Sequence, residues 1–389
     1  MKLNDKLFKI EKEDSFSKST RLLKEYKASH PDADIVSLGI GDVSFPVPKA
    51  VTKAMEDACL DLSSMDSFQG YGAYWGIEPL RRTIAKEDYK GLDISFEEVY
   101  VGDGTKTDST AILELFDRDI RILTGNPSYP IYKNGAFALG RDVYEAECSA
   151  DFKMTVPKEH FDVIYICSPC NPVGNAYTRD ELSEWIRYAN KEGAVIIYDN
   201  VYRDFIESPG VPMSIYELEG SRTCAIEMHS YSKSASFSGV RCSYFILPKE
   251  FGQDIHTLWR ERTINRFNGA SYIAQRGAIA SYLPEARKEI KERIASYKSN
   301  GYILRECLLS CGFSVTGGVD SPYLWVQTPD KMECWDAFDF FLKKLNIVVV
   351  PGAVFGSNGR HHIRISSLGN RLDCLRAIGR IKRYYEKDL

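Results

Sequence analysis

The chain lacks both a long apolar segment and a cluster of basic residues. No stretch approaches the roughly 18 uninterrupted apolar residues of a membrane helix, so we expect no membrane span. Its 50 Lys and Arg residues are balanced by 54 Asp and Glu residues, and no basic run occurs. This pattern argues against nucleic acid or an acidic membrane surface as a partner. The N-terminal residues have no apolar signal-peptide core, and we expect a cytoplasmic protein.

The ten cysteines form no recognisable framework. In a long chain of this kind they are expected to be reduced core residues rather than disulfides. Cys167 and Cys170 have the spacing of a redox motif, but Asn171-Pro172 follows instead of a helix, and a single pair cannot complete a zinc site. The adjacent histidines at 361 and 362 would point to opposite faces of a strand. We therefore predict no metal site.

The middle of the chain alternates short apolar segments with helical patterns. We predict strands at residues 98–101, 119–124, 162–167, 194–198 and 223–228, and helices at residues 109–116 and 181–190. This alternation is typical of a mostly parallel α/β sheet, in which ligands bind beyond the carboxyl ends of the strands.

The two ends of the chain have a different pattern. Helices are predicted at residues 15–26, 284–297 and 373–387, and strands at residues 35–38, 323–327, 347–350 and 362–366. The pattern indicates a smaller α+β unit built from both termini. We therefore predict a large domain at residues 46–280 and a small domain formed by residues 1–45 and 281–389.

Residues 230–241 carry the most informative pattern, because one lysine lies among small hydroxyl residues directly after a predicted strand. Lys233 could form a Schiff base with an aldehyde cofactor, while Ser230, Ser232 and Arg241 could hold that cofactor's phosphate. The combination fits pyridoxal phosphate. A polar loop with a solvated lysine explains the segment equally well when it is taken alone.

Other polar residues follow neighbouring predicted strands. Asp199 could pair with a pyridinium nitrogen, and Asn171 and Tyr202 could donate to the phenolate oxygen of the ring. Tyr129 could stack on the ring. The alternatives are a helix cap for Asp199, a turn at Asn171-Pro172 and a packing role for the Tyr129 loop.

Two further segments could bind anionic groups. Thr105 and Lys106 open a predicted helix after Gly104, and the amides at a helix start attract phosphate. Arg364 alternates with isoleucines on a late predicted strand and could grip a substrate carboxylate with two hydrogen bonds. An outward-facing arginine on a half-exposed strand is equally compatible with the pattern.

The order of these residues along the chain resembles that of the class I/II, fold-type I aminotransferases. It resembles in particular the LL-diaminopimelate aminotransferase branch. The segments that carry this resemblance are Leu38-Gly-Ile-Gly-Asp42, Gly70-Tyr71-Gly72, Asp103-Gly-Thr-Lys106, Asn171-Pro-Val-Gly174, Phe267-Asn-Gly-Ala-Ser271, Pro322-Tyr-Leu-Trp325, Pro351-Gly-Ala-Val-Phe-Gly356 and Ile363-Arg-Ile-Ser-Ser-Leu-Gly369.

The resemblance implies a mostly parallel seven-stranded sheet flanked by helices, and a homodimer with shared active sites. Lys233 would bind pyridoxal phosphate, with Asp199 and Tyr202 as the other catalytic residues. The phosphate would be held by the Ser230, Ser232 and Arg241 group, by the backbone at Thr105 and Lys106, and by Tyr71 of the partner subunit. Arg364, Asn171 and the backbone at Ile40 and Gly41 would bind the substrate carboxylate. Lys106 and Asn268 of the partner subunit would face the distal part of the substrate.

The chain departs from the family pattern where the substrate's far end is selected. Tyr74 stands where the branch usually has an acidic residue, and Asp14-Ser15-Phe16 stands where a tyrosine is expected. A separate departure follows the phosphate-binding arginine, where Ser243-Tyr244 replaces Gly-Trp. We expect transamination from LL-diaminopimelate to 2-oxoglutarate. An aromatic or neutral amino donor and a C–S β-lyase activity are the alternatives. A non-enzymatic regulator usually carries a DNA-binding domain. We do not expect that function, because the residues before Leu38 leave no room for such a domain and no basic patch occurs.

Overall fold

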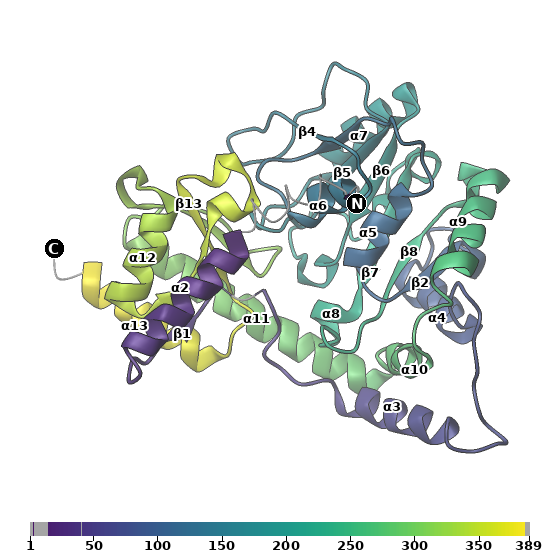
Figure 1. Ribbon diagram of the computed structural model, residues 1–389, viewed down its shortest axis with the longest axis horizontal. Coiled ribbons are helices and arrows are strands. Elements are labelled where there is room, and N and C mark those ends of the chain that lie inside the picture. The colour runs from purple at the N-terminus through teal and green to yellow at the C-terminus, as the bar shows by residue number, and fades with distance from the viewer. Residues whose placement is uncertain (1–2, 4–14, 40, 386–389) are drawn as a thin grey trace.

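The structure is a computed structural model, and it describes residue 3, residues 15–39 and residues 41–385. A seven-stranded sheet forms the larger part of the molecule, and helices flank it (Figure 1). The strand order is β2-β8-β7-β6-β5-β3-β4, with β8 antiparallel to both of its neighbours and the other pairs parallel. The bounds of the strands are β2 Val99–Gly102, β3 Ile122–Thr124, β4 Val143–Glu145, β5 Val163–Cys167, β6 Val195–Asp199, β7 Ala225–Ser230 and β8 Ser243–Ile246. The predicted α/β architecture is confirmed.

The flanking helices bury apolar faces against this sheet. α7 begins with a capping box between Thr178 and Glu181 and ends at Gly193, which adopts the left-handed conformation that favours glycine. Its buried residues include Leu182 and Trp185. The helices of this part are α3 Lys49–Asp61, α4 Glu78–Asp88, α5 Thr105–Leu113, α6 Ile131–Ala138, α7 Arg179–Glu192, α8 Tyr231–Ser234, α9 Gln253–Arg266 and α10 Tyr272–Ala280.

The smaller part combines both ends of the chain. A four-stranded antiparallel sheet, β12-β13-β10-β9, packs with α12 and α13, and a parallel pair β1-β11 brings the N-terminal segment against it. The bounds are α2 Ser15–Ser29, β1 Val36–Ser37, α11 Pro284–Ser310, β9 Val315–Gly317, β10 Tyr323–Gln327, α12 Cys334–Leu345, β11 Ile347–Val348, β12 Val350–Pro351, β13 His362–Ser366 and α13 Arg371–Tyr385. The proposed division at residues 46 and 280 stays a prediction.

Two expectations about this part need correction. The apolar run at residues 347–350 is not one strand, because β11 pairs with β1 whereas β12 pairs with β13 in the other sheet. The helix predicted at residues 284–297 extends to Ser310, and α11 contacts both α3 and α13. Figure 1 shows α11 running from the smaller part to the underside of the larger part. It therefore joins the two parts along one rigid element.

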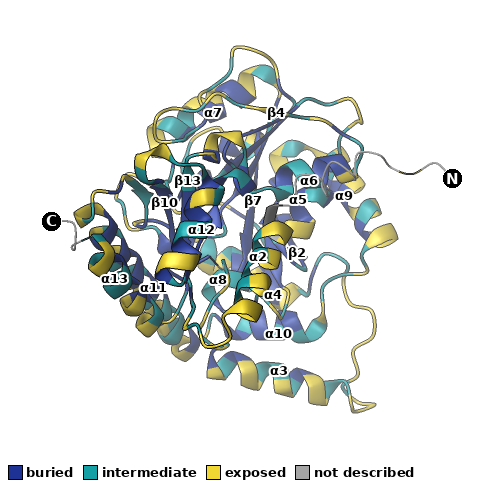
Figure 2. Ribbon diagram, turned by 60° about the vertical axis from the view of Figure 1, so that its left-hand side comes forward, coloured by how far each residue is buried: buried dark blue, intermediate teal, exposed yellow. Residues whose placement is uncertain are grey.

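Apart from the edge strands β4 and β9, the strands of both sheets are mostly buried, whereas the outer faces of α3, α11 and α13 are exposed (Figure 2). Every residue of β7 and β8 is buried. In the smaller part, Phe338 and Phe341 of α12 pack in one cluster with Ile363 and Ile365 of β13. Because these cores are closely packed, the side chains at the edges where the two sheets face each other have defined positions.

Candidate active site

A cavity of about 360 Å³ lies where the carboxyl ends of β5, β6 and β7 meet the smaller sheet. Because these strands are parallel, the segments that follow them emerge at one edge. The predicted site residues that line this cavity are Gly41, Thr105, Lys106, Tyr129, Asn171, Asp199, Tyr202, Ser230, Ser232, Lys233, Arg241 and Arg364. The structure thus brings together residues that lie up to 323 positions apart in the sequence, from Gly41 to Arg364.

Three predicted residues are not among them. Tyr71 is 87% exposed and lies on the surface, and Asn268 does not line the cavity. Both were predicted to act in the active site of the partner subunit, so their roles stay predictions. Ile40 lies outside the described residues.

Lys233 lies on the short helix α8, which begins directly after β7. The Ser230 side chain accepts a hydrogen bond from the Ser232 amide at 3.1 Å and so caps the turn that carries the lysine. Lys233 Nζ donates to the carbonyl oxygen of Gly41 at 2.5 Å and lies 4.0 Å from Asp42 Oδ1. The amine therefore points into the cavity, which disagrees with the alternative of a solvated loop lysine.

Asp199 ends β6 and is only 5% exposed. Its Oδ2 atom accepts a hydrogen bond of 2.6 Å from the Tyr132 hydroxyl, whereas the buried Oδ1 atom has no hydrogen-bond partner among the described residues. Burial raises the pKa of this carboxyl to about 6, and the Tyr132 hydrogen bond lowers it only in part. A buried carboxylate oxygen without a partner is costly, and it fits a cationic N–H donor in the cavity.

One end of the cavity contains groups that can bind an anion. Helix α5 starts at Gly104 without a side-chain cap, so its first amides remain available to a ligand. Gly104 has φ 147°, and a Cβ atom there would overlap the Arg241 guanidinium. Arg241 Nη1 in turn donates to the Ser238 carbonyl at 3.0 Å. A helix start and an arginine thus face one small space.

Ser243, a departure from the family pattern, has a structural function at this end. Its hydroxyl accepts a hydrogen bond of 2.8 Å from the Gly104 amide and donates to Asp108 Oδ2 at 2.5 Å. Burial raises the pKa of Asp108 to about 7. The sequence patterns did not reveal the contact between Ser243 and Asp108, because the two lie 135 positions apart and meet only when β2 pairs with β8.

Arg364 occupies the opposite end of the cavity and is 4% exposed. Its Nη1 atom donates to Asn171 Oδ1 at 2.8 Å and Nη2 donates to the Gly39 carbonyl at 2.9 Å, whereas the buried Nε atom has no partner. No ion pair joins Arg364 to a carboxylate within residues 15–39 and 41–385. The outward-facing alternative is wrong, and a buried cation of this kind fits a carboxylate ligand.

Two tyrosine hydroxyls complete the wall between these ends. The oxygen of Tyr202 lies 3.0 Å from that of Tyr323, a β10 residue that sequence reasoning missed. Burial raises the pKa of Tyr202 well above its usual value, so the phenol stays protonated. Tyr129 meets Tyr132 edge to face at 5.8 Å, and burial raises the pKa of Tyr129 to about 12.

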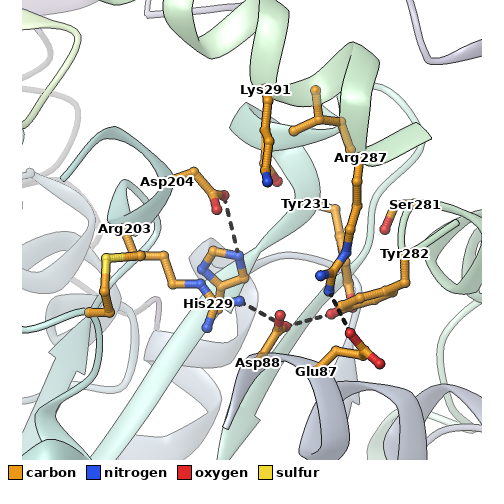
Figure 3. A pocket seen from close by; sticks show the side chains of 13 residues that line it. Glu87, Asp88, Arg203, Asp204, His229, Tyr231, Ser281, Tyr282, Arg287 and Lys291 are labelled. Carbon is orange, nitrogen blue, oxygen red and sulfur yellow. Dashed lines mark hydrogen bonds and ion pairs between the residues drawn. The ribbon is translucent and has the colours of Figure 1, made fainter. Parts of the chain in front are cut away.

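A second cavity, of about 250 Å³, is lined in part by Tyr231 and Ser234 of the lysine-bearing helix α8. Figure 3 shows the side chains that line it. Asp88 accepts hydrogen bonds there from Tyr244 at 2.7 Å and Tyr282 at 2.5 Å, and Arg203 Nη2 lies 2.7 Å from it. Burial alone raises the pKa of Asp88, but the Arg203 charge and the hydrogen bonds outweigh it and lower the pKa overall. Because Arg203 follows Tyr202 and Tyr231 precedes Lys233 by two residues, this cluster supports the active-site segments from behind.

The described residues contain no group of three or more histidine, cysteine or acidic side chains placed to hold a metal ion. The described cysteines are all free thiols. A search of the described helices finds none with the length and apolar character needed to cross a membrane.

The family described as "Aminotransferase class I and II" matches residues 33–381. The chain belongs to this family. It is 41% identical to the LL-diaminopimelate aminotransferase of Lachnospira eligens, with 98% of this chain and 99% of that protein aligned. It is 39% identical to the corresponding protein of Bacteroides fragilis, with 98% of each chain aligned.

The aminotransferase also resembles solved structures of the family. The L,L-diaminopimelate aminotransferase from Chlamydomonas reinhardtii superposes with a TM-score of 0.89 at 36% identity, and the match covers 95% of each chain. The family and fold predicted from the order of the motifs are confirmed. The protein is therefore an enzyme of the transaminase class.

Proposed function

We propose that this aminotransferase uses pyridoxal phosphate to move an α-amino group from an amino acid to a 2-oxo acid. The single observation that carries the proposal is the unpartnered Oδ1 atom of Asp199 in the same cavity as the Lys233 amine. A structural aspartate would satisfy both oxygens, whereas this one lines the cavity and keeps one acceptor without a partner among the described residues.

The residues present fit this cofactor. Asp199 Oδ1 would accept the pyridinium N–H, Tyr202 and Asn171 would donate to the phenolic oxygen, and Tyr129 would lie along the ring. The phosphate would bind the start of α5 and the group of Ser230, Ser232 and Arg241. When bound, pyridoxal phosphate supplies an aldehyde that links covalently to an amine and a ring that withdraws electrons from the substrate α-carbon.

The residues of the chain then position the substrate and move its proton. Arg364 binds the α-carboxylate, because its buried guanidinium donates to Asn171 and to the Gly39 carbonyl and has no acidic partner among the described residues. Lys233 Nζ takes the proton from the α-carbon of the amino donor. In the return half-reaction it delivers a proton to the α-carbon derived from the 2-oxo acid. Gly41 orients the amine through its carbonyl.

The substrates that this proposal favours are LL-diaminopimelate as donor and 2-oxoglutarate as acceptor. The support is the similarity to LL-diaminopimelate aminotransferases, which are 37–41% identical over nearly the full chain. Tyr74, in place of an acidic residue, makes an aromatic or neutral donor the alternative. A screen of donors with 2-oxoglutarate separates the two. Activity with phenylalanine or alanine and none with diaminopimelate would reject the first, and pyruvate release from cystathionine would indicate a β-lyase.

A homodimer with shared active sites is part of the proposal. Leu60, Met65, Phe68 and Tyr71 are large apolar side chains that are each more than 60% exposed in the single chain. Such a group on one segment is typical of an interaction surface. We propose that Tyr71 reaches the phosphate in the partner subunit. The free thiols are consistent with a cytoplasmic location, which we also propose.

A further inference from the structure

Tyr323 stands between residues of the active site that come from different sheets. It begins β10 in the smaller sheet, pairs with Ser366 of β13, and is 1% exposed. Its ring meets that of Tyr202, which follows β6 of the larger sheet, edge to face at 5.4 Å. Its carbonyl oxygen packs so closely on Gly174 that a Cβ atom there would overlap it. Tyr323 is therefore fixed against the turn that carries Asn171.

The hydroxyl of Tyr323 lies beside two groups that the proposed chemistry uses. Its oxygen is 3.0 Å from the Tyr202 oxygen. A Cβ atom at Gly41 would come within 2.8 Å of the same hydroxyl. Gly41 is also the residue whose carbonyl accepts the Lys233 amine. Removal of this one hydroxyl therefore affects Tyr202 first and leaves the Arg364 contacts intact.

The ring of Tyr323 has a separate function. The guanidinium carbon of Arg364 lies 4.4 Å from the ring centroid, which is the geometry of a cation–π interaction. The same guanidinium carbon also lies 4.9 Å from the centroid of the Phe355 ring. The two rings confine the cation while Asn171 and Gly39 accept its hydrogen bonds. The cation also draws electron density from the Tyr323 ring, which makes its O–H the better donor of the two hydroxyls.

We propose that Tyr323 is a positioning residue that links cofactor and carboxylate recognition. Its hydroxyl donates to Tyr202, so that the Tyr202 proton points toward the phenolic oxygen of the cofactor. Its ring holds Arg364 in the orientation that binds the substrate carboxylate. This inference rests on the proposed function, because the hydroxyl relay needs the cofactor that we propose.

The test compares two substitutions of this residue with a matched control. Tyr323→Phe removes the hydroxyl and keeps the ring, whereas Tyr323→Leu removes both. Tyr216→Phe removes a buried hydroxyl that donates to the Ala225 carbonyl at 3.0 Å, far from the cavity. For each protein loaded with pyridoxal phosphate, the pH midpoint of the cofactor absorbance band and the KM values for donor and 2-oxo acid are measured.

If Tyr323 donates to Tyr202, the hydrogen bond that Tyr202 gives to the phenolic oxygen of the cofactor is strengthened by about 10–30%. Tyr323→Phe removes this support, so the pH midpoint of the cofactor absorbance band should rise by a few tenths of a pH unit. The KM values should stay within about twofold of the wild type. Tyr323→Leu should raise both KM values by about 5- to 30-fold through loss of the cation–π contact. Tyr216→Phe should move neither quantity, although it lowers the melting temperature.

An unchanged or lowered midpoint in Tyr323→Phe overturns the relay, since a lowered midpoint means that Tyr202 donates to Tyr323. Unchanged KM values in a folded Tyr323→Leu protein overturn the function of the ring. These failures differ from failure of the proposed function. A wild-type protein that shows no cofactor band dependent on Lys233 would refute that function, and the inference with it.

Discussion

Asp199 and Tyr132 form a hydrogen bond of 2.6 Å that leaves one carboxylate oxygen of Asp199 buried and unpaired. The pair joins the last residue of β6 to α6. Burial outweighs the Tyr132 hydroxyl and the Val201 backbone amide, which both lower the pKa of Asp199, so this pKa rises to about 6. The second oxygen of the Asp199 carboxylate therefore lacks a hydrogen-bond donor until a cationic ligand supplies one.

The raised pKa of Asp199 predicts that the stability of the cofactor-free protein depends on pH. The pKa of Asp199 is about 6 in the folded chain and 3.8 in the reference state. Between these two pKa values the folded state keeps the Asp199 carboxyl protonated, whereas the unfolded state has lost that proton. The free energy of unfolding therefore falls as pH rises from about 4 to 7. The difference of 2.2 units corresponds to on the order of 3 kcal/mol. Asp199→Asn removes this contribution, so its free energy of unfolding relative to wild type should rise over that interval in urea titrations. A pH-independent difference would contradict the assignment.

The same substitution should impair catalysis. An amide at position 199 cannot stabilise a positive ring nitrogen as a carboxylate does, so we expect kcat to fall by about 10²- to 10³-fold, as when other electrostatic groups are removed from active sites. Tyr132→Phe is the milder companion, because it keeps the charge and removes only one hydrogen bond. Steady-state kinetics at saturating pyridoxal phosphate check both. Equal losses in the two variants would mean that the charge of Asp199 is not the cause.

Arg364 should determine affinity for the carboxylate of both substrates. Arg364→Gln removes a charge-assisted contact of about 1.5–3 kcal/mol, which corresponds to a rise in KM of roughly 10- to 150-fold for donor and acceptor alike. Arg376→Gln is a matched control, because Arg376 lies on the exposed face of α13 and pairs with Asp34 at 2.9 Å. Its KM values should equal those of the wild type. A rise for one substrate only would argue against a shared carboxylate site.

Shared active sites can be tested by complementation between subunits. Tyr71→Ala and Lys233→Ala proteins should each have greatly reduced activity. A mixed dimer would contain one site with an intact Lys233 and Tyr71 of the partner subunit, and a second site lacking both. Random exchange of equal amounts should therefore restore about one quarter of the wild-type sites. If activity stays at the level of the separate variants after subunit exchange has been verified, Tyr71 does not act across the dimer.

Tyr74 should set the preference at the far end of the donor. Tyr74→Glu introduces a carboxylate that can pair with the distal ammonium of diaminopimelate. We expect kcat/KM for diaminopimelate relative to alanine to rise by about 5- to 30-fold, as expected for 1–2 kcal/mol of differential binding. Tyr74→Gln controls for the loss of the ring. Equal ratios in the two variants would place the selecting group elsewhere.

The sequence allowed prediction of those parts of the site that depend on local order along the chain. Asp199 and Lys233 each come at or just after a buried apolar strand, and in a parallel sheet the ends of such strands converge. The bounds of β13 also matched the alternating pattern at residues 362–366. These features depend on hydrophobic periodicity, which a sequence displays directly.

Contacts between distant segments could not be predicted in this way. The burial of Arg364 depends on Asn171 and Gly39, which belong to other parts of the chain. The break between β11 and β12 depends on which strand each half pairs with, and the apolar run alone does not encode that choice. Tyr323 has an ordinary strand pattern, so its position beside Tyr202 emerged only from the packing of the two sheets.

The most direct test of the account is the site of attachment of the cofactor. The holoenzyme is reduced with borohydride, digested, and analysed by mass spectrometry, with Lys233→Ala and Lys106→Ala proteins treated in parallel. The account predicts a phosphopyridoxyl group on Lys233 in the wild type and in Lys106→Ala, and none in Lys233→Ala. Modification of another lysine, or no modification of Lys233 in a protein saturated with pyridoxal phosphate, would contradict it.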